Sequence, residues 1–498
     1  MKKKILIEFH GWTAHYCVYY FFLKALKKKY NNINIDAFAT FPNLFNISLY
    51  RRYLNFFLFL LGSFLNVRSF KKFKLLGTNR IFMPLIKHRY KFLAEKFYKK
   101  NKLKLTKNNL TDLRIDNILI GDLIYDTFLK VYNLPTLNID SKVFINFFIN
   151  YVSLYYYWKN YFKNNSVKTV IVVHASYFTG LPLRISTFKG IKSICGSNDS
   201  VYSLNKKRIY AFQNYLDYKK IFKSLKNKEH IRALSKKNLM DRVKGKIFNL
   251  DSHSSAWNNS KSNLRIKNQD IRKKTRVLIT THLFSDTPHV YGKLLFPDAY
   301  AWLIFLLKLS KKTNYLWFIK VHPDIEELAF DNSFSIIKDL LKSYPHIVLL
   351  DPHTSHHYII NDLKVNAVLT IYGSVAHEYP YFNIPVINAS SNNPHINNKF
   401  CINPKSIKEL KKIILKIPKL KFKADKSELI DFYYMHKIYF DKSWIGIDLR
   451  KFIEKNNGLK KLNEDKQIDI KLLNYIKNHD KIIHKARVFL DSDSYYLN

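Results

Sequence analysis

Cysteine, glycine and proline are all scarce in this chain of 498 residues. Its 3 cysteines, Cys17, Cys195 and Cys401, lie far apart, which excludes a disulfide framework and a cysteine-based zinc module and suits a reducing cytosol. With 12 glycines and 14 prolines, the chain is neither collagen-like nor of low complexity. Hydrophobic residues make up 47% and aromatic residues 16%, which excludes global disorder. At about 100–200 residues per domain, the length predicts two or three domains with substantial cores.

Acidic residues are also few: 37 Asp and Glu stand against 84 Lys and Arg, which gives a formal net charge of +47. Residues with AT-rich codons are abundant throughout, so mutational bias is one explanation of the excess lysine. A surface of this charge attracts polyanions, namely nucleic acids, acidic phospholipids or anionic glycans. Because lysine is spread over the whole chain and no helix-turn-helix, zinc-finger or RNP-like motif occurs, we expect no specific nucleic-acid partner.

Long hydrophobic runs are missing as well. The first residues are apolar only at 5–7 before an acid, too short for the ~7–15 apolar residues of a signal peptide. The most apolar stretches, 54–67 and 143–158, are shorter than the ~20 residues of a membrane span, so we expect no transmembrane helix. Both predict helices, either buried in a core or docked on an anionic membrane surface. Basic residues flank the first stretch at Arg51, Arg52, Arg68, Lys71 and Lys72.

Short β-rich runs alternate with helical patterns in the first half. We expect strands at 4–9, 33–39, 115–120, 168–173 and 191–194. Helices are expected at 16–30 and 183–189. Nearly continuous apolar strands that alternate with helices are typical of a parallel sheet covered on both faces.

The polar segment 251–275 is the best linker candidate, and the alternation restarts after it. Strands are expected at 276–281, 316–321, 347–350, 367–371 and 384–387, and helices at 298–311 and 335–343. We therefore predict an α/β fold with two Rossmann-like, doubly wound domains, 1–250 and 276–420, that face each other across a cleft. A helical tail, 421–498, follows. Such proteins bind ligands beside the carboxyl ends of their strands.

The segment around Gly373 is the most informative one for chemistry. An expected strand runs into Gly373 and Ser374, which can open a helix whose free N–H groups favour a phosphate. Glu378 follows four residues later on the same helix face, within reach of a sugar hydroxyl. The same pattern is also common in α/β proteins without such a role.

A second segment places Lys320 and His322 at the end of an expected strand, which Pro323 stops. A histidine there can donate to a phosphate or protonate a departing group. A single histidine before a proline is a weak indication of function. It becomes stronger here because the Gly-Ser…Glu segment follows some 50 residues later in the same half of the chain.

A third segment follows the first strand of the second half and contains His282, Ser285, Asp286 and His289. Its residues can be drawn as a metal triad, but they lack helical spacing, so a loop that hydrogen-bonds a phosphate or sugar is favoured. The histidines at 353, 356 and 357 are expected on a solvated loop.

Three expected strand ends of the first half also carry polar groups. They are His10 with Gly11, Gly121 with Asp122, and His174 followed by Arg184. Asp122 is a candidate general base for an acceptor hydroxyl, or else a helix cap. Arg184 can hold an anion or decorate a helix, and all these groups are placed on the acceptor side.

With these residues in view, the chain resembles bacterial surface-polysaccharide glycosyltransferases of the GT-B fold. It is most similar to the capsule and lipopolysaccharide group that includes the transferases for Kdo and other ulosonic acids. The resemblance rests on His322-Pro323, Gly373-Ser374 through Glu378, the stretch 284–302 and the stretch 120–126. It covers roughly residues 115–400, and bacterial sialyltransferases and teichoic-acid polyol-phosphate transferases share its short motifs.

The resemblance implies a metal-independent glycosyltransferase with a nucleotide-sugar co-substrate and no other cofactor. The favoured donor is a CMP-ulosonic acid, and the acceptor is a lipid-linked or surface glycan of the cell envelope. His322 and Ser374 would contact the donor phosphate, Glu378 its ribose or sugar, and Asp122 would be the base.

The resemblance also implies a cytoplasmic protein at the periphery of the inner membrane. Three alternatives remain open at this stage: a CDP-polyol phosphotransferase of teichoic-acid type, a basic nucleic-acid-binding protein, and a non-catalytic accessory that binds sugar nucleotides.

Overall fold

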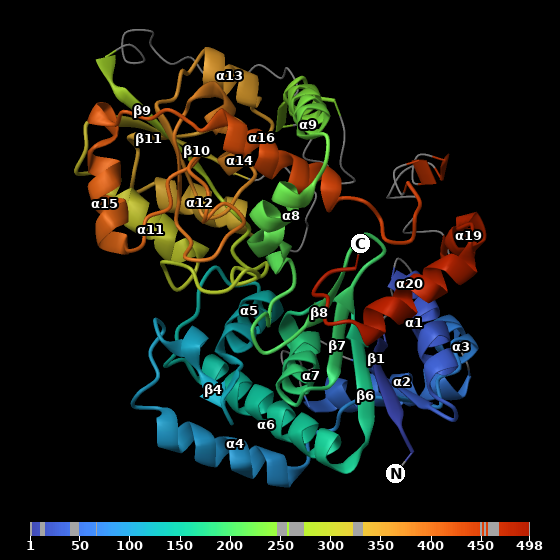
Figure 1. The fold of residues 1–498 in the computed structure, drawn as a ribbon. Helices are drawn as coiled ribbons and strands as arrows, with labels where there is room; N and C mark the ends of the chain where they lie inside the picture. Colours follow the sequence, from blue (N-terminus) through green and yellow to red (C-terminus); the bar gives the residue numbers. More distant parts are fainter. Residues whose placement is uncertain are drawn as a thin grey trace. The chain divides into compact units, whose positions relative to one another are not determined.

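The computed structural model describes residues 2–9, 15–39, 49–65, 67–246, 256–257, 273–321, 332–448, 451–452, 455–456 and 468–497 (Figure 1). The chain divides into two compact units. Unit 1 comprises Met1–Tyr132, Asn138–Asn214 and Phe440–Asn498, and unit 2 comprises Asn133–Leu137 and Tyr215–Tyr439.

These units differ from the domain boundaries that the sequence predicts. The first boundary lies at residue 214 rather than 250, because the helix that follows, α9 (Lys228–Val243), packs on α16 (Lys426–Tyr434) of unit 2. The expected tail is divided: residues up to 439 belong to unit 2, and the rest returns to unit 1. Most of the expected linker lies outside the described residues.

The sheet of unit 1 has six strands in the order β3-β2-β1-β6-β7-β8. All neighbours are parallel except β7 and β8, which are antiparallel. The strands are β1 (Lys4–Phe9), β2 (Asn34–Ala39), β3 (Arg80–Phe82), β6 (Val167–Val172), β7 (Lys192–Gly196) and β8 (Val201–Leu204). The strands expected near 4–9, 33–39, 168–173 and 191–194 are confirmed.

The strand expected at 115–120 is wrong. The structure has instead a two-stranded antiparallel hairpin, β4 (Arg114–Ile115) and β5 (Ile118–Leu119), apart from the main sheet. Asp116 and Asn117 turn the chain with φ of 51° and 65°, a conformation that asparagine and aspartate tolerate.

The helices of unit 1 cover its sheet. They are α1 (Tyr16–Lys29), α2 (Leu49–Phe64), α3 (Arg68–Leu75), α4 (His88–Asn101), α5 (Gly121–Tyr132), α6 (Lys142–Asn164), α7 (Tyr177–Phe188), α19 (Ile468–Tyr475) and α20 (His479–Asp491), with a 3-10 helix at Leu110–Asp112. The expected helices at 16–30 and 183–189 are confirmed as α1 and α7.

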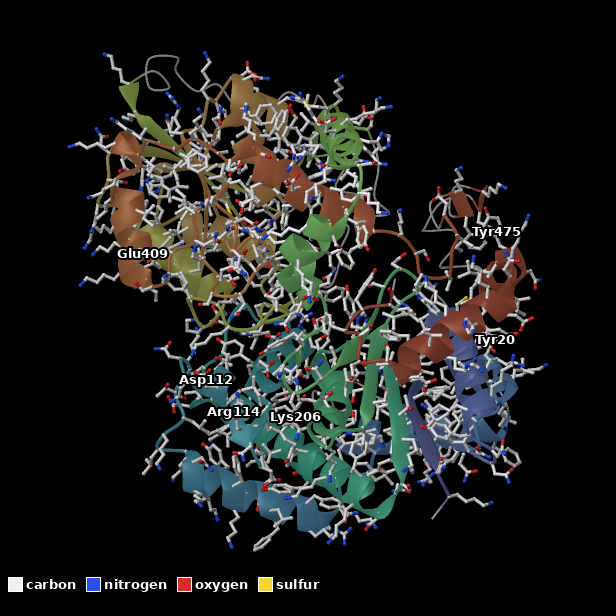
Figure 2. The ribbon with its side chains drawn as sticks, in the orientation of Figure 1. Tyr20, Asp112, Arg114, Lys206, Glu409 and Tyr475 are labelled. Atoms are coloured by element: carbon white, nitrogen blue, oxygen red, sulfur yellow. The ribbon has the colours of Figure 1, made fainter. Side chains whose placement is uncertain are left out.

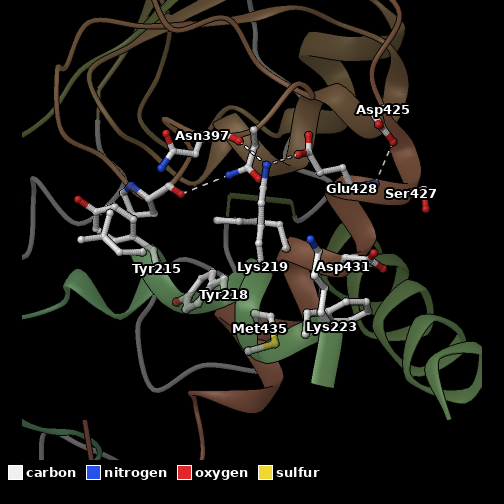
Figure 3. Close-up of a pocket in the computed structure, with 15 residues that line it drawn as sticks. Tyr215, Tyr218, Lys219, Lys223, Asn397, Asp425, Ser427, Glu428, Asp431 and Met435 are labelled. Carbon is white, nitrogen blue, oxygen red and sulfur yellow. Dashed lines mark hydrogen bonds and ion pairs between the residues drawn. The ribbon is translucent and has the colours of Figure 1, made fainter. Parts of the chain in front are cut away.

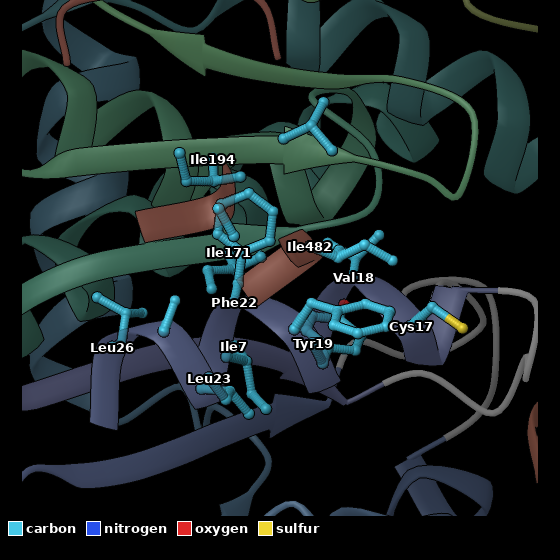
Figure 4. Close-up of a cluster of buried hydrophobic side chains, with 14 of the residues drawn as sticks. Ile7, Cys17, Val18, Tyr19, Phe22, Leu23, Leu26, Ile171, Ile194 and Ile482 are labelled. Carbon is cyan, nitrogen blue, oxygen red and sulfur yellow. The ribbon is translucent and has the colours of Figure 1, made fainter. Parts of the chain in front are cut away.

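The core of unit 1 joins the two ends of the sequence. Figure 4 shows side chains of α1, such as Phe22, together with Ile7 of β1, Ile171 of β6 and Ile482 of α20. Tyr20 and Tyr475, labelled in Figure 2, pack at the margin of the same cluster, half-buried. The C-terminal helices therefore complete a core that the N-terminal strands begin.

Unit 2 has a fully parallel five-stranded sheet in the order β11-β10-β9-β12-β13. Its strands are β9 (Thr275–Thr280), β10 (Tyr315–Lys320), β11 (Ile347–Leu349), β12 (Ala367–Thr370) and β13 (Val386–Asn388). All five match strands that the sequence predicts.

The α-helices of unit 2 are α8 (Tyr218–Ser224), α9, α11 (Ala299–Ser310), α12 (Ser333–Leu341), α13 (His356–Asn361), α14 (Val375–Glu378), α15 (Ile407–Leu415) and α16. Short 3-10 helices occupy Gln213–Asp217, Tyr379–Phe382 and Ile417–Lys419, and a π-helix occupies Met435–Tyr439. The Asp298 side chain caps α11 by accepting a 2.6 Å hydrogen bond from the backbone N–H of Ala301.

Hydrophobic clusters lie on both faces of this sheet. Val277 and Ile279 of β9 pack with Trp302 and other residues on one face, whereas Leu278 packs with Ile359 and others on the opposite face. Alternate residues of a strand point to opposite faces, so the sheet is covered on both sides. The fold is α/β with two Rossmann-like, doubly wound units, as expected for GT-B; the cleft between them stays a prediction.

The two apolar stretches differ in environment. The 143–158 stretch forms most of α6, whose buried residues include Phe147, Tyr151 and Trp158, so it is a core helix and not a membrane-docking one. The 54–67 stretch overlaps α2, which leaves many apolar side chains exposed. Among the described residues, no helix has both the length and the apolar character to cross a bilayer.

Candidate functional site

Each sheet has a point where its strand order reverses. In unit 2, β9 lies between β10 and β12; in unit 1, β1 lies between β2 and β6. In doubly wound proteins, the connections of the two neighbouring strands leave in opposite directions at such a point, and ligands bind there beside the carboxyl ends of the strands. The side chains at these two places are therefore the first candidates for a site.

In unit 2, this position brings two predicted residues together. His282 follows β9, and its Nε2 lies 3.3 Å from the Thr370 hydroxyl at the end of β12. The His282 ring packs on the ring of Tyr372 with centroids 4.5 Å apart. Gly373 adjoins this pair, because its backbone N–H donates a 3.2 Å hydrogen bond to the Thr370 hydroxyl. His282 and Gly373 thus meet although they are far apart in sequence.

Gly373 keeps the space beside His282 open. A Cβ atom at this position would lie 2.9 Å from the Thr370 hydroxyl oxygen and 3.8 Å from Cε1 of His282. Gly373, Ser374 and His282 are all partly exposed. A ligand can therefore approach the backbone here more closely than it could approach any other residue type.

The helix expected after Ser374 is shorter than the phosphate-binding prediction requires. α14 spans only Val375–Glu378 and continues as a 3-10 helix, and the Ser374 side chain makes no capping hydrogen bond. A single turn sums few peptide dipoles, so its amino end has little pull on an anion. Any anion contact here would come from individual N–H and hydroxyl groups.

Glu378 does not have the environment expected of a sugar contact. It is 1% exposed, and its Oε1 accepts a 2.6 Å hydrogen bond from Nε of Arg242. Its Oε2 accepts a 3.3 Å hydrogen bond from Nε1 of Trp257. Burial, the largest single effect, raises the pKa of the Glu378 carboxyl, but Arg242, His356 and Lys437 together hold the pKa below its usual value. Both oxygens are taken up by the protein, which corrects the expected role on a ribose.

Lys320 and Ser285 are buried rather than open to a ligand. Lys320, at the end of β10, donates from Nζ to the carbonyl of Pro352, and burial lowers its pKa to about 8. Ser285 is 2% exposed. His322, and His10 with Gly11 in unit 1, lie outside the described residues, so their predicted roles stay predictions.

In unit 1, the reversal point holds an acid that sequence reasoning missed. Glu8 near the end of β1 is 3% exposed, and its Oε2 accepts a 2.9 Å hydrogen bond from the backbone N–H of Val173. Burial raises the pKa of Glu8 to about 7, against the lowering effect of that hydrogen bond. The sequence feature that could have pointed to Glu8 is an acidic residue within an otherwise apolar strand. His174 follows β6 at the same edge and is exposed; its acceptor-side role stays a prediction.

The structure pairs Asp122 with Arg184, two residues predicted separately. Asp122 lies in the first turn of α5, 4% exposed, and Arg184 on α7, 1% exposed. The guanidinium donates to both carboxylate oxygens, at 3.3 and 3.1 Å, and also to the carbonyl of Leu119. The Arg184 guanidinium lies over the ring of Tyr210, 5.0 Å from its centroid. This buried pair ties α5 to α7, and Arg184 occupies both carboxylate oxygens of Asp122, so the structure assigns the two side chains to each other and not to an acceptor.

The remaining histidines of unit 2 are mostly structural. His289 contacts the carbonyl of Pro297 at 3.1 Å, and His356 contacts the hydroxyl of Tyr379 at 2.7 Å. His356 and His357 lie on α13 and not on the expected solvated loop, whereas His353 is exposed as expected.

Three further histidines form a buried group, hereafter the histidine cluster: His377, His395 and His436. Nδ1 of His377 lies 2.9 Å from Nε2 of His395, and the ring of Phe432 packs against all three. Burial is the main cause that lowers the pKa of each. Among the described residues, no three side chains of His, Cys, Asp or Glu are arranged to hold a metal ion.

A pocket of about 330 Å³ lies beside this cluster (Figure 3). Tyr215, Tyr218 and Phe432 belong to its aromatic lining. Several of its charged groups are already paired within the chain, since Lys219 donates to Glu428 at 2.6 Å and Asp431 accepts two hydrogen bonds from an arginine on α9. Part of the polar lining of the pocket is therefore engaged within the chain and not directed at a ligand.

Comparisons with known proteins do not identify a family for the chain. No family model and no curated protein matches the chain. Among solved structures, KpsC of Thermosulfurimonas dismutans, a β-Kdo 2,4 transferase, is similar over 54% of this chain and 79% of its own, with 10% identity and a TM-score of 0.34.

Two other similar structures cover more of the chain. UDP-GlcNAc 2-epimerase from Neisseria meningitidis matches over 87% of this chain and 96% of its own, with 12% identity and a TM-score of 0.23. Heptosyltransferase II of E. coli matches over 84% and 98%, with 11% identity and a TM-score of 0.22. At these values, the likenesses define neither the family nor the activity of this chain.

Proposed function

We propose that the protein is a glycosyltransferase that moves a sugar from a nucleotide-activated donor to a glycan acceptor in envelope polysaccharide biosynthesis. One observation carries this proposal: His282 and Gly373 meet at the reversal point of the unit 2 sheet. A partly exposed imidazole beside an open stretch of backbone suits a phosphate and the nucleoside attached to it.

In this proposal, unit 2 binds the donor and unit 1 binds the acceptor. His282, the N–H groups after Gly373 and the Ser374 hydroxyl would bind the donor phosphates, and His322 would act on the departing phosphate. Neutralising that charge with hydrogen-bond donors needs no metal ion. Glu8 replaces Asp122 as the group proposed to accept a proton in unit 1, because Asp122 is bound by Arg184.

The finer assignments rest on the resemblance of the sequence motifs. We propose a CMP-ulosonic acid as the donor and a lipid-linked glycan at the inner face of the cytoplasmic membrane as the acceptor. A polyol-phosphate donor carried by CDP is the competing outcome, and only a donor assay separates the two.

The test is nucleotide binding by the full-length protein. Thermal shift and calorimetry with CMP, CDP, UDP and GDP should give one clear hit, since a ligand at 100 times its Kd adds about 2.7 kcal/mol to the free energy of unfolding. His282→Ala should abolish that binding, and Gly373→Ala should weaken it because the new methyl group would crowd the Thr370 hydroxyl.

His346→Ala is the matched control. His346 precedes β11 at the amino-terminal edge of the same sheet and is exposed, so its replacement should leave nucleotide binding unchanged. The proposal fails if no nucleotide binds, or if His282→Ala binds as the wild type does.

A further inference from the structure

From Leu54 onward, where the structure describes its side chains, one face of α2 is apolar and exposed. Phe57 is 60%, Phe64 84% and Leu65 60% exposed, values expected of polar residues rather than of Phe and Leu. The exposed residues at helical spacing form what we call the α2 stripe: Leu54, Phe57, Leu58, Leu61, Phe64 and Leu65. Positions three and four apart lie on one face of a helix, so the stripe is continuous.

The opposite face of α2 already has its packing partners. Phe59 is 6% exposed and packs with Phe70 of α3 at a ring-centroid distance of 5.2 Å. Met83 and Ala39 belong to the same buried cluster. The hydrophobic core of unit 1 therefore accounts for one side of α2 and leaves the α2 stripe unexplained.

The surroundings of the stripe are basic. Between Asp36 and Glu95, the sequence has ten Lys and Arg residues and no Asp or Glu. Lys71 and Lys74 are exposed on α3, directly after α2, and Leu75 beside them is 73% exposed. The segment between Asp36 and Glu95 thus combines exposed apolar side chains with positive charge and contains no acidic residue.

We propose that the α2 stripe docks unit 1 on an anionic lipid bilayer. Leucine and phenylalanine side chains would enter the boundary between headgroups and acyl chains, and the lysines of α3 would lie against anionic headgroups. A second copy of this chain fits less well, because it would bring an equally basic segment to the same face. The helix lies on the membrane in this proposal and does not span it.

The docking surface is independent of the proposed sugar transfer, because no residue of either crevice belongs to it. If both hold, docking would bring unit 1 to lipid-linked acceptors. A failure of nucleotide binding would therefore leave the docking proposal intact, and the reverse also holds.

Vesicle flotation tests the apolar part of the surface. Wild-type protein should float with vesicles of phosphatidylcholine containing about a third phosphatidylglycerol, and much less with phosphatidylcholine alone. The variant Phe57→Ser/Leu61→Ser/Phe64→Ser should lose at least about tenfold in partition coefficient. Its midpoint of thermal unfolding should stay near that of the wild type, because the replaced side chains are exposed.

The control removes exposed apolar residues elsewhere on the chain. Leu234, Leu415 and Val488 are 42%, 42% and 53% exposed on α9, α15 and α20. The triple serine variant at these three positions should float as the wild type does.

A charge reversal tests the basic part and remains informative if the serine variant folds poorly. Lys71→Glu/Lys74→Glu should lower the partition coefficient by roughly tenfold or more, and the loss should shrink at high salt. Lys408→Glu/Lys411→Glu on α15 makes the same change in net charge at exposed positions and should have little effect.

Three results would overturn the proposal. The first is wild-type protein that does not float with anionic vesicles. The second is a stripe variant that floats as well as the wild type. The third combines two observations: sedimentation velocity finds a dimer for the wild type and a monomer for the stripe variant, while both proteins bind vesicles equally. That result would make the stripe an interface between two copies of the chain.

Discussion

Glu378 and Arg242 form a buried ion pair in which Nε and Oε1 are 2.6 Å apart and both side chains are almost inaccessible to solvent. The pair joins the turn after β12 to α9, and Trp257 donates to the second carboxylate oxygen. The acid that the sequence motif suggests for a ligand thus stabilises the interior of unit 2.

Removing one partner of this pair should be far more costly than removing one partner of a surface pair. We expect Arg242→Ala to lower the free energy of unfolding by about 3–5 kcal/mol, because the Glu378 carboxylate would stay buried and unpaired. Arg232 lies on α9, as Arg242 does, and forms an exposed ion pair with Asp431 of α16. Arg232→Ala breaks this pair and should lower the free energy of unfolding by about 0–1 kcal/mol. Urea unfolding followed by circular dichroism measures both, and equal losses would contradict the assignment of a buried pair.

Asp122 offers a second comparison, between structural and catalytic roles. Asp122→Asn should leave Arg184 buried without its counter-ion and cost about 3–5 kcal/mol of stability. Asp116→Asn, which breaks an exposed pair with Lys159 in the same unit, should cost at most about 1 kcal/mol. If Asp122→Asn instead kept full stability and lost only turnover, Asp122 would be the general base after all.

The sequence predicts the strands well because the strands of both sheets are short, nearly continuous apolar runs. β1, β6 and β9 each read this way, and each lies in the centre of its sheet. The hairpin β4–β5 resembles such a strand in sequence, because Asp116 and Asn117 are the only polar residues of 115–120. The apolar pattern does not reveal their positive φ angles.

The partners of the candidate site residues could not be read in the same way. Arg242 lies 136 residues from Glu378, and Arg184 lies 62 residues from Asp122. Only tertiary packing decides that these cations meet these acids. By contrast, the meeting of His282 with Gly373 follows from strand order, since each follows a central strand of one sheet.

Glu8 should make the stability of unit 1 depend on pH. Its pKa is raised from 4.5 to about 7 in the folded protein. The contribution of protonated Glu8 to the free energy of unfolding is therefore fully present below about pH 4.5 and is lost as the pH rises through 7. We expect Glu8→Gln to stabilise the protein by about 1–3 kcal/mol at pH 8, and by little at pH 5.

Urea unfolding of wild-type protein and Glu8→Gln across this pH range measures the effect. Glu95→Gln on α4, which is half-exposed, is the control and should change stability little at either pH. An equal effect of Glu8→Gln at both pH values would show that the carboxyl is ionised throughout. In a transfer assay, Glu8→Gln should also remove any pH dependence of the rate near 7.

The histidine cluster should have the opposite effect in unit 2. Burial lowers the pKa of His395 from 6.5 to about 3. The contribution of neutral His395 to the free energy of unfolding is therefore fully present above about pH 6.5 and is lost as the pH falls below that value. His377 lies in direct contact and shifts in the same direction. For each histidine that stays neutral in the folded state, the free energy of unfolding should fall by about 1.4 kcal/mol per pH unit below 6.5.

The measurement is the slope of the free energy of unfolding between about pH 5 and pH 6.5. His395→Gln should flatten this slope, whereas His230→Gln, at an exposed position on α9, should not. A slope that is the same in all three proteins would mean that His395 takes up a proton as readily in the folded state as in the unfolded one, so that its pKa is not lowered.

The return of residues 440–497 to the first sheet has a consequence for biosynthesis. All of unit 2 after Asn214 is translated between the strands of unit 1 and the helix α20 that closes its core on α1. Unit 2 can mature on the ribosome as an almost continuous insert, while unit 1 must wait with Phe22 and Ile7 uncovered. Chaperone dependence during synthesis is therefore expected to fall on the unit that begins first.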